Sequence, residues 1–218
     1  MGSSAVVLAL LVVLAALAAG AVWGLAHCWR FQSKFAGLRF EQGGGGAPPR
    51  AGDLILFASA HSVTSSFFTQ CFFTHVGVVV EGEGEGGEPV LLLAETREAC
   101  GPRLVPLAPL LRGYLGLACH SALTPPLGPA GRAALASAAA ARGAPYPRPA
   151  DAAADALAGC CLSGTRHCFQ HAGHLLGAAG ITPHLARLGP VASCRAVCRL
   201  FGRPLAGGRR YGRPRRLN

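Results

Sequence analysis

Short apolar runs separated by polar segments occupy the chain from about residue 50 to residue 123. Residues 53–57, 76–80 and 90–94 are mostly Val, Leu, Ile and Phe, and each run has the length of a buried strand. Residues 81–89 are rich in Gly and Glu, which predicts a solvated hairpin loop between the second and third strands. Residues 104–111 are expected to form a loop and a short helix, and residues 115–123 a fourth strand.

Helical patterns follow the strands. Residues 129–142 are alanine-rich and stop at a Gly-Ala-Pro breaker, and residues 151–158 predict a second short helix. Residues 165–179 predict a third helix, with Thr165 as its N-cap and Gly180 after its C-terminus. Because strands come first and helices second, the pattern favours an α+β fold over alternating βα units.

The first part of the chain has a different pattern. Residues 5–26 contain no charged side chain, and a helix of that length spans about 33 Å at about 1.5 Å per residue, enough for the core of a bilayer. A cleaved signal peptide is the alternative, although the basic n-region of such peptides is missing. The first charges are Arg30, Lys34 and Arg39, so the positive-inside bias predicts that the rest of the chain is cytosolic.

These patterns divide the chain into four parts. We expect a membrane anchor over residues 1–27, a Gly/Pro-rich linker over 28–50, a folded domain over 51–200 and an Arg-rich tail over 201–218.

The cysteine count bears on the compartment. The chain has nine cysteines, an odd number, and their spacing is irregular, which does not suit a secreted disulfide framework. We therefore expect a reducing compartment with mostly free thiols. The cysteines are Cys28, Cys71, Cys100, Cys119, Cys160, Cys161, Cys168, Cys194 and Cys198.

The formal net charge of +10 is concentrated at the C-terminus. No acidic residue follows Asp155, whereas arginines crowd residues 195–216. Such a segment attracts anions, and with an anchor on the same chain we expect a membrane lipid surface as its partner. The arginines and aromatic residues do not alternate in a stripe that could read a nucleic acid, so no specific nucleic-acid partner is expected. A solvated tail without any partner is the alternative.

Two side chains of the predicted hairpin carry candidate chemistry. If the hairpin is symmetric, with Val80 opposite Val90, His75 lies directly opposite Glu95 on the same face of the sheet. A carboxylate in that place holds an imidazole in one tautomer and raises its basicity. This prediction depends on the assumed register, and a purely structural His–Glu pair is the alternative.

Cys168 supplies the third candidate. With Thr165 as N-cap, Cys168 lies in the first turn of its helix, where the partial positive charge of the helix N-terminus stabilises a thiolate. An imidazole within reach would deprotonate the thiol, as nucleophilic catalysis requires. A buried structural thiol is the alternative for any one of nine cysteines.

The chain resembles the permuted NlpC/P60 papain-like cysteine hydrolases, and is most similar to their poxvirus-type members. The resemblance covers residues 51–182 and rests on seven short stretches in the same order. These are 52–57 (GDLILF), 74–80 (THVGVVV), 93–96 (LAET), 103–107 (RLVPL) running on to 112–115 (RGYL), 143–146 (GAPY), 167–170 (HCFQ) and 178–181 (AAGI).

The resemblance implies a permuted site with His75 as base, Glu95 as its polar orienter and Cys168 as nucleophile. It also implies a small antiparallel sheet packed against the cysteine-bearing helix. Three features depart from the pattern: many relatives have an acid where this chain has Gln170, and the membrane segment and Arg-rich tail have no counterpart. If the likeness extends to a viral source, the membrane is that of a host cell or virion.

The function that we expect is a membrane-anchored thiol hydrolase or acyltransferase, which forms an acyl-cysteine intermediate from an amide or ester of a lipid, lipidated protein or peptide. The alternative from another class is a catalytically silent binding module at a membrane. A zinc site is a weaker alternative, built on one helix and a nearby cysteine pair. Its ligands would be drawn from Cys160, Cys161, His167, Cys168, His171 and His174. We expect no cofactor and no metal.

Overall fold

The structure is a computed structural model that describes residues 7, 11–15, 18–19, 22, 47–58, 73–84, 86–97, 100–141, 145, 167–182, 188, 196–197 and 199–217. The predicted helix over residues 151–158, the cysteines 160 and 161 and the proposed N-cap Thr165 lie outside these residues.

An antiparallel sheet of six strands forms the centre of the fold, with the order β4-β3-β2-β1-β5-β8. Its strands are β1 (Leu54–Ala58), β2 (His75–Glu83), β3 (Pro89–Arg97), β4 (Gly101–Pro106), β5 (Leu117–Ser121) and β8 (Arg215–Arg216). A second sheet pairs β6 (Leu123–Thr124) with β7 (Arg210–Tyr211). The predicted α+β class is confirmed.

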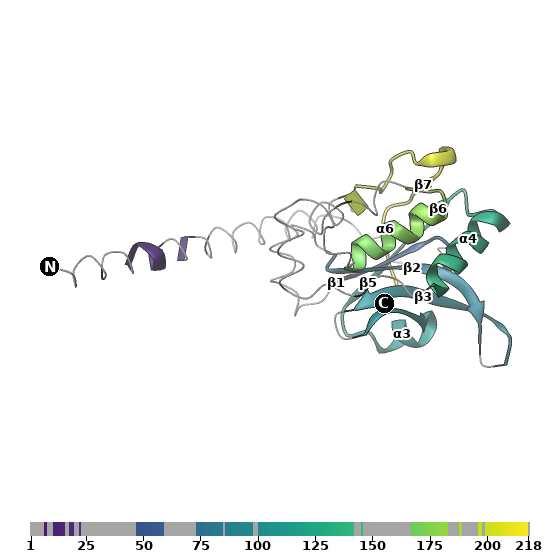
Figure 1. Ribbon diagram of the computed structural model, residues 1–218, viewed down its shortest axis with the longest axis horizontal. Coiled ribbons are helices and arrows are strands. Elements are labelled where there is room, and N and C mark those ends of the chain that lie inside the picture. The colour runs from purple at the N-terminus through teal and green to yellow at the C-terminus, as the bar shows by residue number, and fades with distance from the viewer. Residues whose placement is uncertain are drawn as a thin grey trace.

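Helices cover both faces of the sheet (Figure 1). On one face, α4 (Pro129–Ala140) and α6 (Cys168–Ala178) pack against β2 and each other, and their core includes Leu56, Val78 and Leu176. On the other face, α3 (Leu107–Gly113) covers a smaller core that includes Phe57 and Leu93. The central strand β1 is buried on both sides, which explains its continuous apolar run.

The edge strand β4 was not predicted. Residues 101–106 form β4 at the edge of the sheet, where the apolar pattern predicted the beginning of a loop. The strand is only partly buried and starts with Gly101 and Pro102, two residues that are depleted in strand interiors but acceptable at an edge.

The Arg-rich segment is paired with the sheets, contrary to the expectation of an appended tail. Tyr211 is fully buried and donates a hydrogen bond of 2.7 Å from its hydroxyl to the carbonyl of Gly52. β7 pairs with β6, and β8 extends the main sheet beyond β5. Arg210, Arg213 and Arg215 nevertheless stay exposed, so the segment presents its charge from a folded edge.

Among the described residues, no helix is both long enough and apolar enough to cross a membrane. Most of residues 5–26 lies outside the described residues. The membrane anchor therefore stays a prediction.

The burial of Tyr211 makes the Arg-rich segment part of the stability of the domain. We expect Tyr211→Ala to lower the free energy of unfolding by about 3–5 kcal/mol, because it empties a buried aromatic site and removes a hydrogen bond. Urea denaturation of the full chain measures this change. The exposed neighbour Arg213 is the control, and Arg213→Ala should change the free energy of unfolding by less than about 0.5 kcal/mol. If both variants changed the free energy of unfolding by the same small amount, Tyr211 would not be packed in the core as described.

Candidate active site

His75 is the first residue of β2 and lies opposite Phe57 of β1. The two rings are 5.6 Å apart between centroids, and Tyr114 contacts the Phe57 ring at 4.8 Å. Directly paired residues share one face of an antiparallel sheet, so the imidazole stands over the face that α3 covers. Its side chain is 19 % exposed, which leaves the ring accessible at the end of the strand.

The hairpin register differs from the predicted one by two residues. Val80 pairs with Leu92 and Val90 pairs with Gly82, so the assumption that Val80 faces Val90 is wrong. Glu95 lies opposite Arg103 of β4. A shift of two keeps every side chain on its face, because side chains alternate with a period of two. The predicted direct pairing of His75 with Glu95 is therefore wrong, but Glu95 is a diagonal neighbour on the same face, and the His75 Nε2–H donates to Glu95 Oε2 at 2.6 Å.

Glu95 is fully buried and every contact of its carboxylate is with a cationic or imidazole group. While Oε2 accepts from His75, Oε1 accepts from Arg103 Nε at 2.9 Å and lies 3.0 Å from Arg97 Nε. Burial opposes the ionised form, but the hydrogen bond and charge of His75, with Arg103 and Arg97, lower the pKa of Glu95 to about 2. The stability that this carboxylate contributes is thus complete above about pH 4.5 and is lost as the pH falls toward 2.

Cys168 is the first residue of α6, and the N-cap of this helix is His167. The prediction of Thr165 as N-cap is therefore wrong, although Cys168 does lie in the first turn. The Nδ1 of His167 accepts from the Phe169 N–H at 3.2 Å, which satisfies one of the free N–H groups at the helix start. At the other end, Gly180 adopts a positive φ of 71° and the Ile181 N–H reaches Leu176 O, as the predicted C-terminus requires.

Gln170 belongs to the cap of the helix. It is fully buried; its Oε1 accepts from the His167 N–H at 3.1 Å and its Nε2 donates to Leu188 O at 2.9 Å. A carboxylate at this position could make the first of these bonds but not the second. Both polar atoms of the Gln170 amide are thus engaged with the backbone.

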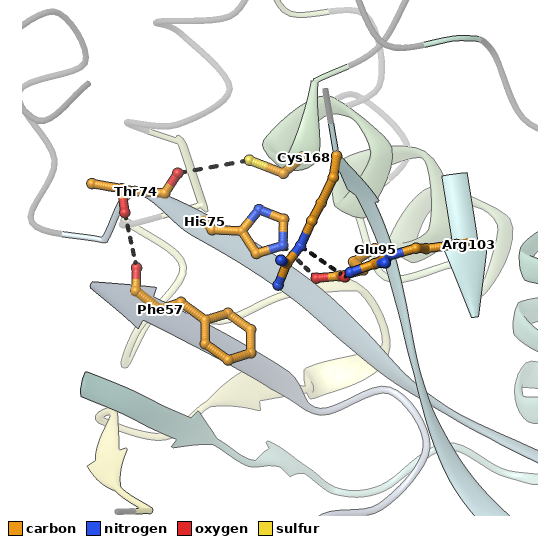
Figure 2. A network of polar contacts seen from close by, with 7 residues as sticks. Phe57, Thr74, His75, Glu95, Arg103 and Cys168 are labelled. Atoms are coloured by element: carbon orange, nitrogen blue, oxygen red, sulfur yellow. Dashed lines mark hydrogen bonds and ion pairs between the residues drawn. The ribbon is translucent and has the colours of Figure 1, made fainter. Parts of the chain in front are cut away.

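The cysteine and histidine come together where the start of α6 crosses the start of β2. Figure 2 shows the His75 ring between the Cys168 thiol and the Glu95 carboxylate. The Cys168 Sγ lies 3.9 Å from Thr74 O, which precedes His75 in the chain. The structure therefore brings all three predicted site residues into one cluster.

His75 and Cys168 change each other's pKa. Burial opposes the charged imidazolium, but the Cys168 thiolate and hydrogen bonds to Cys168 and Glu95 outweigh it and raise the pKa of His75 to about 9. Burial likewise opposes the thiolate, but the charge of His75 and hydrogen bonds with His167 and His75 lower the pKa of Cys168 to about 6. Between these two values the pair exists as thiolate and imidazolium.

This arrangement fits nucleophilic chemistry. With its Nε2–H committed to Glu95, the neutral His75 ring carries its lone pair on Nδ1, the atom left to accept the thiol proton. A thiolate is the nucleophilic form of cysteine, and an imidazolium beside it can return the proton to a leaving group.

Three residues of the cluster were not predicted to act in it. Arg97 and Arg103 contact Glu95, and His167 forms a hydrogen bond with Cys168. Arg97 lies on β3 itself, two residues after Glu95, and the pairing of β3 with β4, a strand that was not expected, carries Arg103 to the site. For His167, position next to Cys168 was the only signal in the sequence.

Other candidates lie outside this cluster. Within the described part of the chain, no group of three His, Cys, Asp or Glu side chains is arranged to hold a metal ion. Cys160 and Cys161, which the zinc alternative requires, lie outside that part. The three described cysteines, Cys100, Cys119 and Cys168, are free thiols, and burial raises the pKa of Cys119 to about 12.

Comparison with known proteins adds no family to this geometry. No protein-family model matches the chain, and a search of curated proteins finds no match.

The two roles of His167, cap and thiolate partner, can be separated. Serine is a good N-cap, so we expect His167→Ser to keep the free energy of unfolding within about 1 kcal/mol of wild type. It removes the imidazole beside Cys168, so the apparent pKa for alkylation of that cysteine should rise above about 6. Mass spectrometry of the Cys168 peptide after iodoacetamide treatment across a pH series measures this value. An unchanged pKa would mean that His167 acts as a cap alone.

Proposed function

We propose that the chain is a permuted NlpC/P60 papain-like thiol hydrolase or acyltransferase, anchored in a membrane, that acts on an amide or ester through an acyl-cysteine intermediate. The observation that carries the proposal is the position of His75, which is hydrogen-bonded to a buried carboxylate on one side and coupled to a thiol at a helix N-terminus on the other.

The reaction begins at the thiol. In the ion pair His75 Nδ1 already holds the proton of Cys168, and the thiolate attacks the carbonyl carbon of the substrate to form a carbon–sulfur bond. The carbonyl oxygen becomes an oxyanion. The backbone N–H of Cys168 is available to donate to it, because the N–H groups of the first helical turn have no partner within the helix.

The intermediate then collapses in two stages. The imidazolium of His75 gives its proton to the leaving nitrogen or oxygen, whose bond to the carbonyl carbon breaks and leaves a thioester. Water, or another acceptor, next loses a proton to His75 and attacks the thioester. The carbon–sulfur bond breaks and Cys168 returns as a thiolate. Throughout, Glu95 stays ionised and holds the ring in one tautomer, which accords with its pKa of about 2.

The membrane part of the proposal rests on residues 5–26. The described residues of this segment are helical and expose large apolar side chains, with Leu11, Val12 and Val22 58–67 % exposed. An apolar helix without charges suits a bilayer better than water. The basic flank places the domain on the cytosolic side, and the exposed arginines of residues 203–216 fit an anionic lipid surface. Lipid and lipidated-protein substrates suit this location best.

The proposal predicts that Cys168 is far more reactive than its small exposure suggests. At about pH 7, iodoacetamide should alkylate Cys168, which is 6 % exposed, faster than the exposed thiol of Cys100. In His75→Ala the Cys168 rate should fall by at least about thirtyfold, because a thiol with an ordinary pKa is only a few per cent ionised there.

Site-resolved mass spectrometry follows both cysteines in the same sample, and Cys100 is the internal control. Its rate should be the same in wild type and in His75→Ala. Faster labelling of Cys100 than of Cys168, with no effect of the histidine change, would instead identify a silent papain-like module with a structural thiol.

A further inference from the structure

Glu95 contacts two arginines, more than are required to neutralise the charge of its carboxylate. Arg103 binds Oε1 through both Nε and Nη2, and Arg97 Nε lies 3.0 Å from the same oxygen. The second oxygen is already occupied by His75. The imidazolium of His75 and the guanidinium of Arg103, which makes two hydrogen bonds, already neutralise the carboxylate. The positive charge of Arg97 is therefore not needed to balance Glu95.

The surplus charge faces water. Arg97 and Arg103 are 40 % and 31 % exposed, whereas Glu95 is completely buried beneath them. In the described part of the chain, neither arginine forms an ion pair with a second carboxylate. Arg97 approaches Glu95 through Nε at 3.0 Å, and the two terminal nitrogens of its guanidinium carry four further N–H donors.

The cluster as a whole carries a net positive charge. Cys168 and Glu95 contribute two negative charges in the ion-pair state, and His75, Arg97 and Arg103 contribute three positive ones, which leaves one positive charge. A positive excess at the mouth of a site attracts anionic ligands and repels cationic ones.

We propose that Arg97 and Arg103 form an anion subsite, which binds a carboxylate or phosphate of the substrate beside the bond that Cys168 attacks. This inference rests on the proposed function, since it assigns a substrate class to the same site. Planar guanidinium groups suit both anions, because they present paired N–H donors to two oxygens at once.

The contacts also place the anion relative to the reacting carbonyl. The hydrogen-bonded path from a guanidinium through Glu95 and the His75 ring to the thiol is on the order of 10 Å long, and this length is an upper limit for the straight distance between guanidinium and thiol. A negative charge up to about three residues from the scissile bond of a peptide falls within that limit, at roughly 3.3 Å per residue. A phosphate a similar number of bonds from an acyl ester does as well.

A pair of alkylating reagents tests the subsite without knowledge of the substrate. Iodoacetyl-aminohexanoic acid and its primary amide carry the same reactive group, and differ only in a negative or neutral end about 10 Å from the thiol. Both react with the thiolate, so the ratio of their rates at Cys168 cancels any change in the ionised fraction. We expect the acid to react about three to ten times faster than the amide, relative to their ratio with N-acetylcysteine.

Arg97→Gln should bring this ratio down to that of N-acetylcysteine, because it removes the terminal guanidinium donors, whereas any change in the ionised fraction of Cys168 affects both reagents alike. Arg132→Gln is the matched control. Arg132 is 41 % exposed and lies 3.3 Å from a carboxylate oxygen of Glu81, six residues along β2 from His75. In Arg132→Gln the ratio of the acid rate to the amide rate at Cys168 should equal that of wild type.

Two outcomes would overturn the inference separately from the proposed function. Rapid labelling of Cys168 by both reagents at the N-acetylcysteine ratio would remove the anion subsite and leave the thiolate site standing. Equal loss of the ratio in Arg97→Gln and Arg132→Gln would show that the effect is that of the overall charge. If neither reagent labels Cys168 in preference to Cys100, the proposed function itself fails, and the subsite with it.

Discussion

The site depends on one hydrogen bond, from His75 Nε2 to Glu95 Oε2 at 2.6 Å. It fixes the tautomer of the imidazole and turns Nδ1 toward the thiol, so that the proton of Cys168 has a defined acceptor. A fully buried carboxylate would normally be costly, and the positive groups around it make it tolerable. Glu95 is thus a fixed negative charge, and the state of His75 and Cys168 follows from it.

The fold delivers these groups from separate layers. β2 and β3 supply His75 and Glu95 on the face of the sheet that α3 covers, while Cys168 belongs to the core on the opposite face. They can meet because His75 is the first residue of its strand, where α6 begins beside the sheet end. The cap made by His167 and Gln170 sets where the helix begins, and so sets the position of the sulfur.

Much of this arrangement could be predicted from sequence, for identifiable reasons. The central strands are continuous apolar runs, and the three site residues are chemically distinctive. The hairpin register was missed by two residues because β2 continues through residues 81–83 of the predicted loop, whereas β3 takes only Pro89 from its other end. β4 and β8 were missed because edge strands carry Pro and Arg, which resemble loops in a sequence. The error in register did not change the predicted site residues, because a shift by an even number of residues keeps Glu95 on the same face of the sheet as His75.

The thiolate–imidazolium pair of Cys168 and His75 is the central claim, and its direct test is an ultraviolet titration of thiolate absorbance. The difference between wild type and Cys168→Ser isolates the signal of that one cysteine. The account predicts that this signal rises with a midpoint near pH 6 and persists through neutral pH. A signal that appears only above about pH 8.5, the ordinary value for a free thiol, would contradict it.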